Sequence, residues 1–196
     1  ESLVDGALDD KEIAQKFSNA ILKNSEKLSY LLEDILNLST IESGEYNLEL
    51  KENGVSDIFE TSINSVLSNN PEVKIINNIS SDIKVICDIK ALSQVIDNLI
   101  ENSLKYGITE ESNEIIINMK DQGSKVRFEI EDHGEGIPLD QRERVFERFF
   151  RIQNSNTSLK EGTGLGLSIV KNLINLMGGS VGNEKAYPEG TIFWFT

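Results

Sequence analysis

Two asparagines stand four residues apart in a segment with the apolar periodicity of a helix. Asn98 and Asn102 share one face of the helix expected over residues 90–106, and Lys105 and Tyr106 follow one turn later. Neutral amide oxygens beside a cation suit a magnesium ion that already carries phosphate oxygens, because magnesium prefers hard oxygen donors and keeps few protein ligands. Asparagine is also ordinary polar surface on a helix, so this pair alone does not decide between the two interpretations.

A carboxylate and two glycines follow a segment, 125–131, whose alternating apolar residues predict a strand. Gly134 and Gly136 let the backbone approach a flat ligand without an intervening Cβ atom. Asp132, at the end of the strand, can accept a hydrogen bond from an exocyclic amine. Asp132 is therefore a candidate reader of adenine, with Ile137 directly after the turn. The same pattern also occurs in plain turns.

A glycine-rich turn opens the helix expected over residues 165–176. Its members are Gly162, Thr163, Gly164, Leu165 and Gly166. Backbone N–H groups that glycine leaves accessible can point at phosphate oxygens, and the positive end of the helix dipole favours the same anion. The spacing differs from the dinucleotide-binding G-x-G-x-x-G pattern, and no Gly-Lys-Ser/Thr follows. Neither a Rossmann site nor a P-loop is indicated.

An aromatic and basic segment, residues 144–151, precedes that turn. Its aromatic residues, Phe146 among them, could anchor a mobile loop to the core, while Arg148 or Arg151 could reach a terminal phosphate. The polar stretch 152–161 has almost no apolar residues and is interpreted as a flexible lid. The sequence leaves open which of the two arginines reaches the phosphate.

Apolar periodicity and turn residues predict the elements that must position these groups. One long amphipathic helix is expected over residues 10–41. It could lie against the following domain, but its long, continuous stripe favours pairing with a partner helix or a second chain. Strands are expected at 48–50, 73–79, 84–87, 114–120, 125–131, 180–184 and 191–195, and further helices at 55–68, 90–106 (with Gly107 at its C′ position) and 165–176. This order predicts an α+β fold, a mixed β-sheet with helices on one face, preceded by the long helix.

Composition and charge exclude several functional classes. The 196 residues allow one full-sized domain plus a short accessory element, and the net charge of −14 opposes binding to nucleic acid. Apolar runs span only a few residues, so no bilayer-spanning segment is expected. The single cysteine indicates a reducing compartment. The chain starts with Glu1 and lacks a signal-peptide pattern, so we expect it to be a piece of a longer protein.

In this order, the clusters resemble the catalytic, ATP-binding domain of bacterial sensor histidine kinases, which has the GHKL or Bergerat-type ATPase fold. The N box of that family is matched by residues 94–106, the first glycine box by 132–136, the F box by 146–151 and the second glycine box by 162–166. Residues 28–43 resemble the second helix of the dimerisation and phosphotransfer hairpin, closest to kinases of the PhoR and WalK type. The resemblance implies two units, the end of this hairpin over residues 1–46 and the catalytic domain over 47–196.

The resemblance implies ATP and Mg²⁺ as cofactors and gives the polar residues roles. Asn102 would coordinate Mg²⁺, with Asn98 beside it. Asn98 also stands where hydrolytic relatives such as gyrase-type ATPases carry a glutamate that activates water. Because a neutral amide is a poor base, phosphoryl transfer to a held side chain is favoured over hydrolysis. Arg148 or Arg151 would neutralise charge on the transferring γ-phosphoryl group.

The same resemblance places the nucleotide. Asp132 would read adenine, while Lys105 and Tyr106 would meet phosphate and the ribose or base. The other residues expected at the nucleotide supply clearance, apolar contact or backbone amides, and they are Gly134, Gly136, Ile137, Phe146, Gly162, Thr163, Gly164, Leu165 and Gly166.

One departure from the family limits what this piece can do alone. In the family, the phosphoacceptor is a histidine on the first hairpin helix, followed by an acidic residue and then proline. Here the only histidine, His133, lies in a glycine-flanked turn. The piece is therefore expected to donate the γ-phosphoryl group to a hairpin histidine outside this sequence, for onward transfer to an aspartate of a response regulator receiver domain. The intact kinase would be a homodimer through its hairpin, membrane-anchored, with this part in the cytoplasm and touching neither nucleic acid nor membrane.

Two other functions stay open. The first is a hydrolytic GHKL-type ATPase, which would release phosphate without an acceptor. The second is a non-catalytic module that binds nucleotide or docks a partner through the pocket or the helix 10–41.

Overall fold

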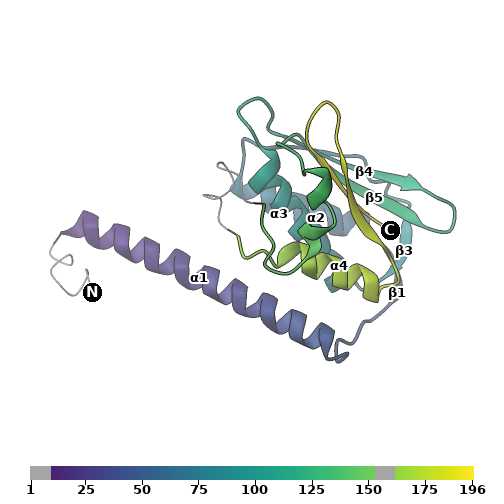
Figure 1. Cartoon of the computed structure of the whole chain (residues 1–196), viewed down its shortest axis with the longest axis horizontal. Coiled ribbons are helices and arrows are strands. Elements are labelled where there is room, and N and C mark those ends of the chain that lie inside the picture. The colour runs from purple at the N-terminus through teal and green to yellow at the C-terminus, as the bar shows by residue number, and fades with distance from the viewer. Residues whose placement is uncertain (1–9, 153–161) are drawn as a thin grey trace.

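A computed structural model describes residues 10–152 and 162–196, so most of the expected lid, 153–161, lies outside the described residues. One long helix leads into a body of strands and shorter helices (Figure 1). The elements are α1 (Lys11–Glu42), β1 (Lys51–Gly54), α2 (Ser56–Asn69), β2 (Lys74–Asn77), β3 (Lys84–Cys87), α3 (Ile89–Asn102), the π-helical turn η2 (Ser103–Gly107), β4 (Glu114–Asp121), β5 (Val126–Asp132), the 3₁₀ turns η3 (Leu139–Gln141) and η4 (Arg144–Phe146), α4 (Gly166–Leu176), β6 (Val181–Lys185) and β7 (Thr191–Phe195).

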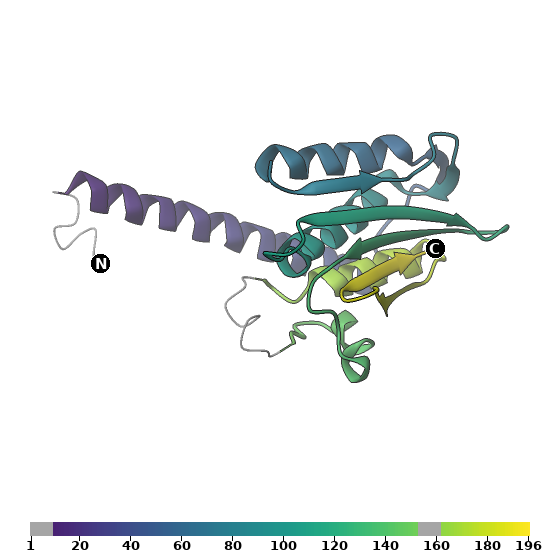
Figure 2. The ribbon, with the colours of Figure 1, turned by 90° about the horizontal axis from the view of Figure 1, so that it is seen from above.

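Five strands form one mixed sheet in the order β2-β4-β5-β7-β6. The β2–β4 pair is parallel, and the other neighbours are antiparallel. Helices α2, α3 and α4 pack on one face, with α3 between the other two (Figures 1 and 2). The predicted α+β fold with helices on one face of a mixed sheet is therefore confirmed. A separate antiparallel pair, β1 with β3, was not expected.

Alternation along β5 places the predicted site residue Asp132 on the helix side of the sheet. Phe128, Ile130 and Asp132 lie two residues apart, and each is at most 3% exposed. Phe128 joins α2 to the sheet, since its ring centroid lies 5.4 Å from that of Phe59 and 5.2 Å from that of Phe195 on β7. The packing of the core thus sets the direction in which Asp132 points.

The strand expected at residues 48–50 is wrong, because the strand lies just after it. Leu48 packs against the core from an irregular segment, and the amide of Glu49 donates to the Asp88 carboxylate at 2.8 Å. The β1 residues that pair with β3 are polar and mostly exposed. The spacing of apolar residues therefore indicated residues that pack on the core, but it did not indicate the polar residues of β1 that pair with β3.

The helix expected over residues 90–106 is α-helical only to Asn102, and its last turn is a π-helix, Ser103–Gly107. The role expected for Gly107 is also corrected, since Gly107 ends this wider turn and its φ is not positive. A Cβ atom on Gly107 would collide with the side chain of Asp132. The glycine is needed because two backbones and a carboxylate meet there.

The long helix is confirmed, but little of its apolar stripe packs on the body. Leu38 and Ile41 are buried in the core, with Leu31 packed against it. The stripe residues Ile13, Phe17, Ile21, Leu28, Leu32 and Ile35 are 38–66% exposed. The first turns of α1 project beyond the body (Figure 2). Among the described residues, no helix has the length and apolarity to cross a bilayer.

Phe59→Ala should lower the free energy of unfolding by about 3–5 kcal/mol, because it deletes a fully buried ring at the junction of α2 with the sheet. Urea unfolding followed by tryptophan fluorescence measures this. The control Ile86→Ala, at a side chain that is 71% exposed, should change the free energy by about 0.5 kcal/mol or less. Equal losses in the two variants would contradict the assigned core.

Candidate functional site

One cavity of about 780 Å³ gathers residues that are far apart in the sequence. Its walls come from α3 and η2, the segment after β5, the turn that opens α4, strand β7 and one side of α1. The predicted site residues that line it are Asn98, Asn102, Lys105, Tyr106, Asp132, Gly136, Ile137, Arg151, Gly162, Thr163, Gly164 and Gly166. All four sequence clusters therefore contribute residues to one space.

Four predicted site residues do not line this cavity. Leu165 is fully buried at the start of α4, and Phe146 is buried with its ring edge-on to Phe193 at 6.4 Å. Gly134 lies behind the wall, where a Cβ atom would strike the carbonyl oxygen of Tyr106. Of the two candidate arginines, Arg151 lines the cavity and Arg148 does not.

Asp132 is a buried carboxylate with its two oxygens in different environments. Oδ1 accepts hydrogen bonds from the amides of Gly134 at 3.1 Å and Thr191 at 3.2 Å. Oδ2 has one long contact, to the Ser103 hydroxyl at 3.5 Å. Burial raises the pKa of this carboxyl above its ordinary value, although the two amide hydrogen bonds oppose the shift. Oδ2 keeps acceptor capacity for a donor in the cavity.

The asparagine amides are oriented by the helix that carries them. Asn98 Nδ2 donates to the Gln94 carbonyl at 2.9 Å, and Asn102 Nδ2 donates to the Asn98 carbonyl at 2.8 Å. Each amide uses its donor on the helix, so each Oδ1 is left as a hard, neutral acceptor. This donor set fits a magnesium ion, which prefers oxygen ligands.

The glycine-rich turn packs tightly against α3 on one side and against the backbone at Phe149 on the other. An added Cβ atom on Gly166 would lie 2.5 Å from Asn98 Oδ1, so a larger residue would displace the amide. Gly164 has φ +74° and lies against the backbone of Phe149, whose amide donates to the Gly164 carbonyl at 2.9 Å. The Thr163 hydroxyl accepts from the Leu165 amide at 3.1 Å. The turn is thereby held beside the asparagine pair.

Sequence reasoning missed residues that reach the site only through tertiary structure. Ser103 and Thr191 contact the Asp132 carboxylate, although they lie 29 and 59 residues away from it. Asp34 and Asn37 of α1 also line the cavity. The only signal for Thr191 is the pairing of β5 with β7, which places it opposite Asp132, and no local pattern reveals that register.

The fold and the site together define an ATPase domain. The sequence profile of histidine kinase-, DNA gyrase B- and HSP90-like ATPases matches residues 87–196. The chain belongs to this family, and its similarity to named sensor kinases makes it the histidine kinase type of catalytic ATPase domain.

The relatives agree on this type. The sensor histidine kinase WalK of Bacillus subtilis is 30% identical over all of this chain and 32% of its own length. The solved structure of full-length ShkA in complex with AMPPNP is 26% identical, with a TM-score of 0.78, and the match covers 92% of this chain and 38% of that one. The fold also matches histidine kinase ThkA, solved with response regulator protein TrrA, at a TM-score of 0.70 and 24% identity over 95% of this chain and 51% of that one. The chain spans about a third of the length of the Bacillus relative.

Asp132→Asn should make the fold more stable at neutral pH, because it removes a buried charge while an amide oxygen still accepts from Gly134 and Thr191. The raised pKa of Asp132 means that, as pH falls, the folded state takes up a proton before the unfolded state does. The wild type thus gains stability from this group as pH falls through its folded pKa, and the advantage of the variant shrinks. Urea unfolding at pH 7 and pH 5 measures the free energy of unfolding of the wild type and the variant. If the stability gained by the variant were larger at pH 5 than at pH 7, the raised pKa of Asp132 would be contradicted.

Proposed function

We propose that this chain is the catalytic part of a sensor histidine kinase of a two-component system. It binds Mg-ATP and donates the γ-phosphoryl group to a histidine of the dimerisation hairpin in the intact protein. Residues 1–46 belong to that hairpin and 47–196 to the catalytic domain. The observation that carries the proposal is the convergence of Asp132, the Asn98–Asn102 pair and the glycine-rich turn on one cavity.

The nucleotide lies with its base at Asp132 and its phosphates toward the turn 162–166. Asp132 Oδ2 accepts a hydrogen bond from the adenine amine, since Oδ1 already holds two backbone amides. Tyr106 and Ile137 line the cavity at the base and ribose, and Lys105 meets phosphate. The backbone amides of Gly164 and Gly166, near the start of α4, meet the terminal phosphates.

Asn102 would hold magnesium through Oδ1, with Asn98 beside it, and the bound ion would supply positive charge against the phosphates. The side chains of the protein position the nucleotide and stabilise its negative charge. Arg151, which lines the cavity, faces the transferring group. Glu101, which also lines the cavity, is paired with Lys105 at 3.1 Å. A neutral Asn98 is a poor base, so transfer to a positioned histidine is favoured over hydrolysis.

The partners follow from the class of kinase. A receiver domain of a response regulator takes the phosphoryl group onward to an aspartate, the type of partner with which the similar ThkA was solved. A homodimer through the complete hairpin covers the exposed apolar residues of α1. The location proposed for this part of the kinase is the cytoplasm.

Asp132→Asn should weaken Mg-ATP binding by roughly 10- to 100-fold, because a hydrogen bond to a charged acceptor is lost and an amide donor can face the adenine amine. Isothermal calorimetry measures the affinity. The matched control is Glu131→Gln, on the same strand but on the opposite face, which should bind within about twofold of wild type. Unchanged affinity in Asp132→Asn would refute the adenine assignment.

Radioactive ATP should label a separately supplied hairpin that carries its histidine, and it should leave this chain unlabelled. The control is the same hairpin with that histidine changed to alanine, which should stay unlabelled. Steady phosphate release without any acceptor would favour the hydrolytic ATPase. Absence of magnesium-dependent nucleotide binding would favour the docking module.

A further inference from the structure

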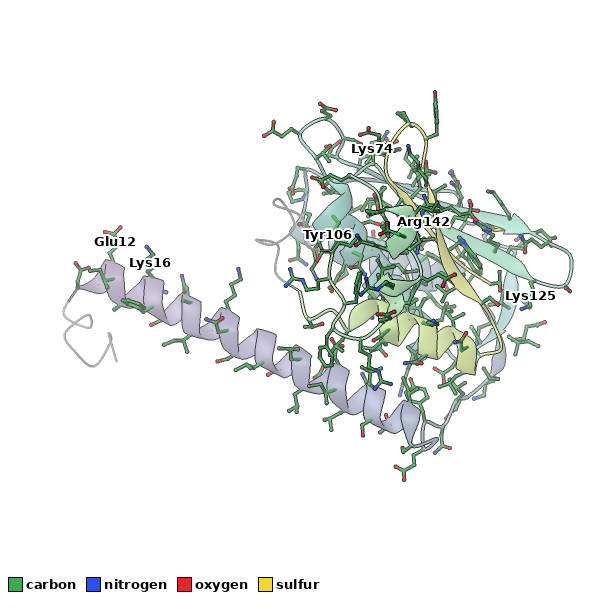
Figure 3. The ribbon with its side chains drawn as sticks, in the orientation of Figure 1. Glu12, Lys16, Lys74, Tyr106, Lys125 and Arg142 are labelled. Carbon is green, nitrogen blue, oxygen red and sulfur yellow. The ribbon has the colours of Figure 1, made fainter. Side chains whose placement is uncertain are left out.

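Helix α1 forms part of the cavity wall. Lys23, Glu33, Asp34 and Asn37 all line the cavity, although they precede the catalytic residues by 60 positions or more. Leu31, Leu38 and Ile41 pack this stretch of the helix onto the core. The far end of α1, with Glu12 and Lys16, stands clear of the body (Figure 3). The contact with the site therefore lies over residues 23–37 of α1, away from its far end.

Asp34 reaches the glycine-rich turn from this helix. Its Oδ2 lies 3.5 Å from the Thr163 hydroxyl, at the outer limit of a hydrogen bond. Burial raises the pKa of the Asp34 carboxyl, while the contact with Thr163 acts to lower it, and the nearby charge of Glu101 raises it further. The carboxylate therefore lies in a partly desolvated position with an acidic neighbour, and a hydroxyl of the turn is its hydrogen-bond partner.

Asp34 lies away from the adenine end of the cavity. Asp132 contacts Ser103, Gly134 and Thr191, whereas the groups around Asp34 are Thr163, Glu101, Lys105 and Glu33. The two carboxylates share none of these neighbours. The Asp34 carboxylate thus sits at the turn where the proposed nucleotide places its terminal phosphates.

We propose that Asp34 competes with the terminal phosphate of the nucleotide for this turn, so that docked α1 discriminates against the triphosphate relative to the diphosphate. Two anions cannot share one donor in a partly desolvated site without a large repulsion. Triphosphate binding therefore undocks α1, and by reciprocity docked α1 weakens triphosphate binding by the same factor. This inference rests on the proposed function, because it needs a nucleotide in this orientation.

The test compares AMPPNP with ADP, each with Mg²⁺, by calorimetry on the whole chain. Asp34→Asn keeps the side-chain size and removes the charge. It should tighten AMPPNP binding by on the order of tenfold and ADP binding by about twofold or less. The matched control is Glu12→Gln, which makes the same charge change at an exposed position on the far end of α1 and should alter the AMPPNP-to-ADP ratio by about twofold or less.

A second readout follows the helix itself. Amide hydrogen exchange over residues 31–41 should rise when AMPPNP binds the wild type and should change little with ADP. An unchanged AMPPNP-to-ADP ratio in Asp34→Asn, an equal change in Glu12→Gln, or exchange that falls with AMPPNP would each overturn the competition while leaving the proposed function intact. A wild type that binds neither nucleotide would instead overturn the proposed function and this inference with it.

Discussion

The site depends on one desolvated carboxylate at the end of β5. Strand alternation turns Asp132 toward the helices, where burial disfavours its charge and two backbone amides partly compensate. The carboxylate fits only because Gly107 and Gly134 leave room for the close approach of η2 and the following turn. A hydrogen-bonding group is thereby presented to the cavity at a cost in stability, which is the expected trade at a binding site.

The charges around the cavity set a second constraint. Its described walls carry more carboxylates, among them Asp34, Asp97 and Glu135, than cationic side chains, and the chain as a whole carries a net charge of −14. A nucleotide entering without a divalent cation would meet net repulsion. The neutral oxygens of Asn98 and Asn102 suit this setting, because they can ligate magnesium without adding negative charge.

Many residues around the cavity could be predicted from the sequence, but several of the tertiary contacts that bring them together could not. Alternation, helical periodicity and glycine placement predicted Asp132, Asn98, Asn102 and the glycine-rich turn, most of which the structure places around one cavity, because each of these signals is local. Ser103 and Thr191 were missed because their contacts depend on the π turn and on the register of β7 against β5. The β1–β3 pair was missed because its exposed strand has no apolar periodicity. The relation of α1 to the cavity was missed because nothing local encodes where a helix docks.

The place of β7 in the sheet has a consequence for biosynthesis. Thr191, on this strand, donates its amide to Asp132, and Phe193 lines the same cavity, yet both come later in the sequence than every other residue that lines it. A nascent polypeptide held on the ribosome would present α3, the asparagines and the glycine-rich turn long before the final strand emerged. The complete cavity therefore cannot form until β7 has been translated.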